Sequence, residues 1–194
     1  MILFVRHGET APNREGLVLG RAADPELTEE GHRQAERLAA ALVDEVPVAL
    51  YTSPLIRARE TADAIASACG LVSATDERLE EIDWGAWEGR PVTGLGQAEV
   101  ARWRDDSGTP PGGESLRSVG ERMAEFCLEA LERGGAVVAV SHVSPIKAAA
   151  AWALGVEDSV AWRMHLGLAS ITRVDRRGAG PLLVSFNETA HLKP

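Results

Sequence analysis

Short apolar runs alternate with segments of helical periodicity along most of the chain, and this alternation is its most restrictive feature. Residues 2–6, 48–52 and 136–140 are such runs, each with the length and composition of a buried strand. Strands that alternate with helices pair in parallel, because each helix returns the chain to the same end of the sheet. The pattern therefore predicts an α/β fold with a largely parallel sheet.

Capping residues and apolar periodicity place the helices between these strands. Thr28 precedes two glutamates and a helical pattern that continues to about residue 45. Ser53 and Pro54 look like an N-cap with proline at the first helical position, and the pattern continues to about residue 69. Two more helices are predicted at about 115–133 and 144–154, the latter starting at its Ser-Pro pair.

The remaining segments complete the expected topology. Residues 70–75 are a candidate for a short strand, while 169–174 and 182–186 are two late strands joined through the turn-rich residues 176–181. We expect the late pair to be antiparallel at an edge of the sheet. Residues 83–113 are rich in Gly, Pro and Trp, which predicts a long excursion over one face.

The composition is that of a water-soluble globular protein and limits its partners. The 194 residues suit one domain spanning 1–194, and no apolar run of about 18 residues is present that could span a bilayer. A net charge of −9 disfavours binding to nucleic acid. The first apolar stretch is too short for a signal peptide, which predicts a cytoplasmic protein. We expect no nucleic acid or membrane partner, and either a monomer or a homodimer.

Polar side chains follow three of the predicted strands at their carboxyl ends. Arg6 and His7 end the first strand, Arg57 follows the second, and Ser141 and His142 follow the third. In open α/β sheets, ligands bind in the crevice at this edge. Two guanidiniums and two imidazoles there would bind a dianion such as phosphate, and the starts of the following helices would add N–H groups.

The two histidines also admit other interpretations. One histidine alone is more often a hydrogen-bonded core residue than a functional group. As metal ligands, His7 and His142 lack cysteine or carboxylate partners at compact spacing, so we rank a metal site below a phosphate site. Cys69 and Cys127 are far apart and are expected to be buried free thiols. We therefore expect neither a metal nor another cofactor.

Five motifs occur in order along the chain. They are Arg6-His7-Gly8-Glu9-Thr10 with Asn13; Ser53-Pro54 to Arg57-Ala58 with Glu60-Thr61-Ala62; Leu79-Glu80-Glu81 to Trp84-Gly85 with Trp87-Glu88-Gly89; Gly112-Gly113-Glu114-Ser115; and Ser141-His142. A single Arg-His-Gly is weak evidence, whereas five ordered motifs are strong evidence. Together they resemble the histidine phosphatase superfamily, which includes the phosphoglycerate mutases. The resemblance implies a phosphoglycerate mutase-like three-layer α/β/α sandwich.

The resemblance also implies a role for each matching residue. His7 would be the nucleophile that carries the phosphoryl group, and Glu81 the general acid/base, whose carboxyl we expect to hold a proton near neutrality. Phosphate binding is implied for Arg6, Asn13, Arg57, His142 and the backbone around Val143. The implied enzyme is a metal-independent phosphomonoesterase of the histidine acid phosphatase type, acting on a small phosphorylated metabolite.

Several residues keep a second interpretation. Glu81 lies in an acidic run that would ordinarily be solvated, and Asn13 could equally serve a turn. Arg21 could reach the substrate or lie at the surface. The tryptophans are expected to pack in the core or in a lid, with Trp103 the one to watch for contact with substrate.

The sequence departs from the family pattern at two points, and the second of them favours hydrolysis. His142 is followed by Val143, where relatives commonly have glycine or asparagine, and the chain lacks the extended insert of cofactor-dependent phosphoglycerate mutases. Segments 141–147 and 186–192 are most similar to α-ribazole-phosphatase-like and broad-acting bacterial members. We expect a phosphatase whose substrate alcohol meets residues 83–113. A phosphoglycerate mutase and a catalytically silent phosphate-binding or interaction module remain alternatives.

Overall fold

The computed structural model describes residues 1–96, 98, 100–101, 109–178 and 180–193, and it confirms the predicted α/β fold. A six-stranded sheet has the strand order β3-β2-β4-β1-β5-β6. The strands are β1 (Ile2–Arg6), β2 (Pro47–Thr52), β3 (Ser73–Thr75), β4 (Ala136–Ser141), β5 (Ile171–Arg177) and β6 (Gly180–Glu188). The described α-helices are α1 (Ala11–Glu15), α2 (Glu29–Leu42), α3 (Ile56–Cys69), α5 (Leu116–Glu132) and α6 (Val143–Leu154).

The central strands are parallel, and the late pair is antiparallel at one edge, as predicted. Strands β3, β2, β4 and β1 pair in parallel, whereas β5 is antiparallel to both β1 and β6. Arg6 in β1 lies opposite Ser141 in β4, and Thr52 in β2 lies opposite Val140. The carboxyl ends of these three strands therefore meet at one edge of the sheet.

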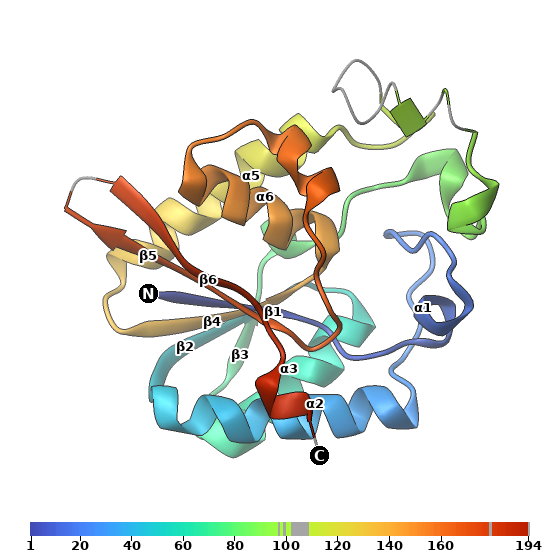
Figure 1. The fold of residues 1–194 in the computed structure, drawn as a ribbon. Coiled ribbons are helices and arrows are strands. Elements are labelled where there is room, and N and C mark those ends of the chain that lie inside the picture. Colours follow the sequence, from blue (N-terminus) through green and yellow to red (C-terminus); the bar gives the residue numbers. More distant parts are fainter. Residues whose placement is uncertain (97, 99, 102–108, 179, 194) are drawn as a thin grey trace.

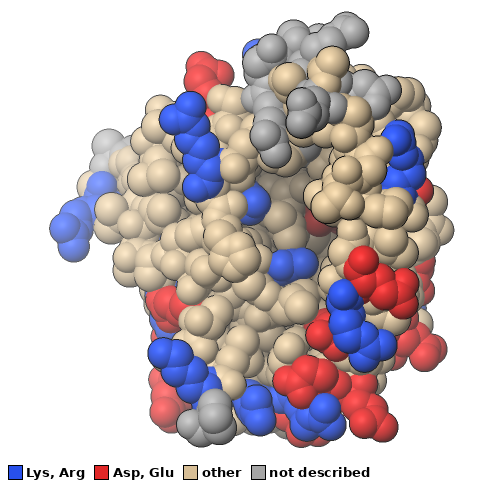
Figure 2. Space-filling model, turned by 45° about the vertical axis from the view of Figure 1, so that its right-hand side comes forward, with Lys and Arg blue, Asp and Glu red and all other residues tan. Residues whose placement is uncertain are grey.

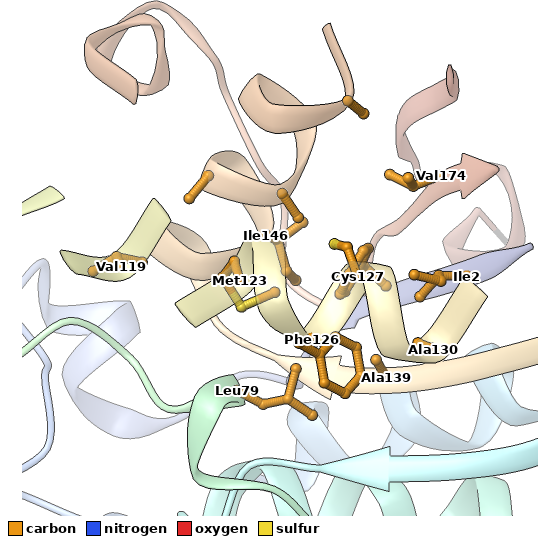
Figure 3. Packing of buried hydrophobic residues seen from close by; sticks show 14 of the residues in the cluster. Ile2, Leu79, Val119, Met123, Phe126, Cys127, Ala130, Ala139, Ile146 and Val174 are labelled. Carbon is orange, nitrogen blue, oxygen red and sulfur yellow. The ribbon is translucent and has the colours of Figure 1, made fainter. Parts of the chain in front are cut away.

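Two helical layers cover the sheet, with α5 and α6 on one face and α2 and α3 on the other (Figure 1). On the first face, Met123, Phe126 and Cys127 of α5 pack with Ile2 and Ala139 of the sheet (Figure 3). All five side chains are at most 1% exposed. Burying a side chain the size of Ile2, Met123 or Phe126 contributes about 1.5–3 kcal/mol to the stability of the fold.

Helix α3 begins later than predicted. Its first residue is Ile56 rather than Pro54, and Leu55 is its N-cap. The hydroxyl of Ser53 accepts a hydrogen bond from the N–H of Leu55 at 3.3 Å, so it caps a turn that precedes the helix. Arg57 nevertheless lies in the first helical turn, as predicted.

Helix α6 begins earlier than predicted. His142 is its N-cap and Val143 its first residue, before the Ser144-Pro145 pair that we expected to start it. Pro145 therefore stands within the first turn, where N–H groups have no intrahelical acceptor and the missing N–H of proline costs little. The earlier start aims the first N–H groups of α6 toward the edge where the strands end.

Two smaller predictions are corrected. Residues 176–177 and 180–181 belong to β5 and β6 rather than to a turn, because the antiparallel ladder continues to Arg177 opposite Gly180. Cys127 is a buried free thiol as expected, whereas Cys69 is only partly buried. Within the described part of the chain, no helix combines the length and the apolar character needed to cross a membrane.

Candidate active site

The register of β1 and β4 brings the two predicted histidines together. Because Arg6 pairs with Ser141, the residues that follow them, His7 and His142, leave the sheet side by side. Their ring centroids lie 5.0 Å apart. Both side chains are buried, so the pair lies in a low-dielectric environment.

Hydrogen bonds fix the tautomer of His7 and the loop that carries it. The Nδ1 of His7 lies 2.7 Å from the carbonyl oxygen of Gly8, and because a carbonyl only accepts, Nδ1 carries the proton. The lone pair of the neutral ring is therefore on Nε2. The N–H of Gly8 donates to the hydroxyl of Thr61 at 3.1 Å. A Cβ at Gly8 would lie 2.5 Å from the carbonyl oxygen of Gly31, so a larger residue would push the loop away from α2.

Arg57 is a fully buried cation held by the loop between α1 and α2. Its guanidinium donates to the carbonyl of Gly20 at 2.7 Å and to that of Ala23 at 3.4 Å, and it lies 3.7 Å from the carboxylate of Asp24. Burial lowers the pKa of Arg57, while the negative charges of Glu81 and Asp24 raise it. A guanidinium stays protonated in proteins, so the charge is permanent.

Arg6 supplies a second cation from the end of β1. One of its terminal nitrogens donates to the carbonyl oxygen of Leu166 at 2.7 Å. Burial lowers the pKa of Arg6 to about 10; Glu81 opposes this effect and Arg57 adds to it. Arg6 therefore remains charged at neutral pH.

Burial and the two arginines keep both imidazoles neutral. Burial is the largest cause that lowers the pKa of His7 well below its ordinary value, and the charges of Arg57 and Arg6 lower it further. The same causes, again led by burial, lower the pKa of His142 well below its ordinary value. A neutral imidazole is a nucleophile, whereas the protonated ring has no lone pair to give.

Three buried nitrogens of these side chains have no hydrogen-bond partner among the residues that the structure describes. They are the Nε atoms of Arg6 and Arg57 and the Nδ1 of His142. The other ring nitrogen of His142, Nε2, lies 2.8 Å from the hydroxyl oxygen of Ser53. Leaving a buried polar group unpaired costs about 1–3 kcal/mol. The arrangement therefore favours a ligand that offers several acceptor oxygens.

Glu81 is buried beside these groups, at 5% exposure, so it is not part of a solvated acidic face. Its carboxylate accepts hydrogen bonds from the N–H groups of Val143 and Ser144, each at 3.1 Å, and from that of Ile82 at 2.8 Å. The N–H of Val143, which we predicted as a phosphate donor, thus donates to Glu81 in this structure. The start of α6 holds the carboxylate at the edge where the two histidines lie.

Arg21 binds the backbone of Glu81. The sequence had suggested either contact with the substrate or a surface position for this residue. Its Nε donates to the carbonyl oxygen of Glu81 at 2.6 Å. Its terminal nitrogens pair with Glu80 at 3.2 Å and with Glu114 at 2.7 Å. Glu114 is also paired with Arg122 at 3.0 Å. The Gly-Gly-Glu-Ser motif therefore anchors the segment that carries Glu81.

Asn13 serves its own loop and also lines the site. Its side-chain oxygen accepts hydrogen bonds from the N–H of Thr10 at 3.2 Å and from the hydroxyl of Thr10 at 2.9 Å. The same residue borders the cavity next to His7. Both interpretations of Asn13 are therefore compatible with its position.

A cavity of about 280 Å³ lies beside His7, and neither Arg57 nor His142 is among its lining residues. Arg6, His7, Asn13 and Glu81 border it, together with Val143 and several apolar side chains. Figure 2 shows a hollow near the centre of one face, with charged atoms inside it and mostly uncharged atoms around it. Among the described residues, no group of three or more His, Cys, Asp and Glu side chains is placed to hold a metal ion.

Sequence reasoning missed part of this cavity. Residues 17–19 line it, although the only sign of this in the sequence is a short apolar run after the first motif. Ser53 was predicted only as a helix cap, yet its hydroxyl contacts His142. Trp84 lines the cavity, while Trp103, the tryptophan that we singled out, lies outside the described residues.

Comparisons with known proteins agree with the motifs. A family model of the histidine phosphatase superfamily (branch 1) matches residues 2–189. A probable phosphoglycerate mutase, GpmB, of Yersinia enterocolitica is 35% identical, over 98% of this chain and 94% of its own length.

Two solved structures extend the likeness to three dimensions. A mutant phosphoserine phosphatase from Entamoeba histolytica, in complex with phosphoserine, has a TM-score of 0.91 and 30% identity, covering 99% of this chain and 98% of its own. A mycobacterial glucosyl-3-phosphoglycerate phosphatase in complex with VO3 has a TM-score of 0.88 and 29% identity, covering 97% of this chain and 98% of its own. The chain belongs to the histidine phosphatase superfamily.

Proposed function

We propose that the protein hydrolyses small phosphomonoesters through a phosphohistidine intermediate on His7. The observation that carries this proposal is that three buried nitrogens, one each from Arg6, Arg57 and His142, have no partner in the described part of the chain, and that these side chains lie near the neutral imidazole of His7. A phosphate group offers three equatorial oxygens and a double negative charge, which match these donors in number and in sign. The cavity beside His7 gives the ester a place to bind.

We call Arg6, Arg57 and His142 the phosphate cage. Their N–H groups would stabilise the negative charge on the phosphate oxygens during the reaction. Arg6 and Arg57 supply two permanent positive charges. The hydroxyl of Ser53 accepts the N–H of Leu55 and lies 2.8 Å from Nε2 of His142, and we infer the tautomer of His142 in which this hydroxyl donates its proton to Nε2. The proton of His142 then sits on Nδ1 and is available to a phosphate oxygen. These donors replace the electrostatic work that a metal ion does in other phosphatases.

The first step transfers the phosphoryl group to the protein. The lone pair on Nε2 of His7 forms a bond to phosphorus while the bond from phosphorus to the ester oxygen breaks. Glu81, in its protonated form, gives its proton to the leaving oxygen and so releases a neutral alcohol.

The second step returns the protein to its starting state. Water attacks the phosphorus of the phosphohistidine, and Glu81, now a carboxylate, takes a proton from that water. The bond from phosphorus to Nε2 breaks, and inorganic phosphate leaves. During both steps Glu81 turns from the start of α6 toward the reacting oxygen, which frees the N–H of Val143 for a phosphate oxygen.

Phosphate release measures this activity directly. The intact protein, His7→Ala and His165→Ala are assayed with 4-nitrophenyl phosphate; His165 is exposed and does not border the cavity, so its variant is the matched control. We expect His7→Ala to lose roughly 10³-fold or more in kcat, because the covalent step is gone, and the control to be unchanged. Undiminished turnover by His7→Ala would remove His7 as the nucleophile.

A phosphoglycerate mutase is the second candidate, because the Yersinia relative is named as a probable one. A mutase would return the phosphoryl group from His7 to the substrate instead of to water. It would interconvert 3- and 2-phosphoglycerate, with stimulation by 2,3-bisphosphoglycerate. Net phosphate release without interconversion would exclude this candidate in favour of the phosphatase.

A further inference from the structure

One side of the cavity is lined by apolar residues that have no role in the proposed binding or transfer of phosphate. We call this side the apolar wall and define it as Leu17, Leu19, Trp84, Val92, Leu95 and Trp162, all of which line the cavity. These residues come from separate parts of the chain: the loop after α1, the excursion after β3, and the segment that follows α6. They share one cavity with His7 and Glu81, where the leaving alcohol of a phosphomonoester would lie.

Backbone hydrogen bonds build this wall before any substrate binds. The N–H of Val18 donates to the carbonyl of Arg90 at 2.9 Å, and that of Gly89 donates to the carbonyl of Val18 at 2.9 Å. The N–H of Val92 donates to the carbonyl of Gly16 at 3.0 Å. The loop after α1 is thus tied to the excursion. A pre-formed apolar surface binds an apolar group without the cost of ordering it.

Among the described residues that line the cavity, Lys, Arg, Asp and Glu side chains occur only at its phosphate end. Among the lining residues that the structure describes, Arg6 is the only Lys or Arg, and Glu81 is the only Asp or Glu. Arg21, a cation of the neighbouring loop, does not line the cavity and is paired with Glu80 and Glu114. Against the part of the wall that the structure describes, a carboxylate on the alcohol would lose its water without gaining a cation.

We propose that the alcohol portion of the substrate is apolar and uncharged, and has the size of one aromatic ring or a short alkyl chain. This inference rests on the proposed function, because it concerns the leaving group of that same reaction. The cavity measures about 280 Å³. A cavity of about 150 Å³ already holds benzene, which leaves room here for the phosphate group. Phosphomonoesters that carry a carboxylate, such as phosphoserine and the phosphoglycerates, are then the poorer substrates.

Matched pairs of substrates test the inference. Butyl phosphate is compared with 3-carboxypropyl phosphate, in which a carboxylate replaces the terminal methyl group, and propyl phosphate, whose leaving group is also an alkoxide, is compared with phosphoserine and 3-phosphoglycerate. Phosphate release gives kcat/KM for each compound. We expect roughly tenfold or greater preference for the uncharged member of each comparison. An equal or higher kcat/KM for the carboxylates overturns the inference.

A charge placed in the wall tests where the alcohol lies. Val92 is 58% exposed, so Val92→Arg adds a cation to the wall without disturbing the core. We expect the preference for butyl phosphate over 3-carboxypropyl phosphate to shrink by about tenfold in this variant. Val72→Arg is the matched control, because Val72 is 91% exposed and does not line the cavity. An unchanged preference in Val92→Arg contradicts the placement of the alcohol against the wall.

The outcomes separate this inference from the proposed function. Phosphate release from all compounds with a preference for carboxylates leaves the phosphatase proposal standing and rejects the apolar alcohol. Absence of phosphate release from every compound contradicts the proposed function and the inference together.

Discussion

The Nδ1 of His7 lies 2.7 Å from the carbonyl oxygen of Gly8, so a single backbone contact decides which ring nitrogen of this proposed nucleophile carries the lone pair. No second side chain is needed to set this tautomer. The position of Gly8 is in turn fixed by the hydroxyl of Thr61 and by its close approach to Gly31. The position of the His7 ring therefore depends on how the loop after β1 packs on α2 and α3.

Gly8→Ala should displace His7. The new Cβ would lie 2.5 Å from the carbonyl oxygen of Gly31, so the loop must shift away from α2. A displacement of about 1 Å at a reacting group can cost on the order of 10²-fold in rate, and we expect a loss of kcat of that size. The check is kcat with 4-nitrophenyl phosphate. Gly180→Ala, where a Cβ meets nothing within 4 Å, is the control, and equal activity in the two variants would contradict the packing argument.

Arg57→Lys should weaken phosphate binding even though the charge is kept. Lysine cannot reproduce the bonds to Gly20 and Ala23, and it lacks the buried Nε, which has no partner among the described residues and which we propose binds a phosphate oxygen. We expect kcat/KM to fall by roughly 10²-fold and inhibition by vanadate to weaken. Arg59→Lys is the control, since Arg59 is exposed on the same helix. Vanadate inhibition that is unaltered by Arg57→Lys would remove Arg57 from the phosphate cage.

Glu114→Gln should impair the proposed proton donation by Glu81. Glu114 forms an ion pair with Arg21, and Arg21 donates a hydrogen bond to the backbone carbonyl of Glu81. Poor leaving groups need the proton more than good ones do. We therefore expect a loss of kcat of about tenfold for butyl phosphate and a smaller loss for 4-nitrophenyl phosphate. Equal losses for the two substrates would point to a purely structural role. Glu129→Gln, which alters an exposed partner of Arg78, should leave both rates unchanged.

Stability should fall as the solution becomes acidic, because His7 and His142 resist protonation when folded. Their pKa values in the folded protein lie well below the ordinary value, chiefly through burial. The unfolded chain therefore binds more protons as the pH falls below about 6.5, which favours unfolding. We expect the urea midpoint to decrease from about pH 7.5 to about pH 5.5. His142→Gln should reduce this slope, and His165→Gln should keep it; equal slopes in the two variants would contradict the linkage.

The sequence was enough to predict the residues at the strand ends. His7 and His142 follow apolar runs. Because β1 and β4 are parallel and in register, the residues that follow them lie at the same edge of the sheet. The position of Arg57 near this edge was predicted in the same way. The helix that carries it begins later than expected, because Ser53 caps the turn before it. Glu81 was found only through the family resemblance, because it lies in an irregular segment with no periodicity to mark its burial.

The rest of the site depends on contacts that leave no local pattern. Residues 16–18 pair with residues 89–92 through backbone hydrogen bonds, so the spacing of side chains in the sequence does not predict this pairing. Arg21 and Glu114 meet across the fold, and neither has a neighbour in the sequence that would predict the pair. These long-range polar contacts could therefore be identified only in the structure.

Trapping the covalent intermediate tests the phosphohistidine most directly. The protein is mixed with radiolabelled phenyl phosphate, quenched within milliseconds in alkali and digested, and the labelled peptide is identified together with the substituted ring nitrogen. We predict label on Nε2 of His7 in the intact protein and in His165→Ala, and none in His7→Ala. Label on Nδ1 or on another residue, or continued phosphate release by His7→Ala, would contradict the assignment.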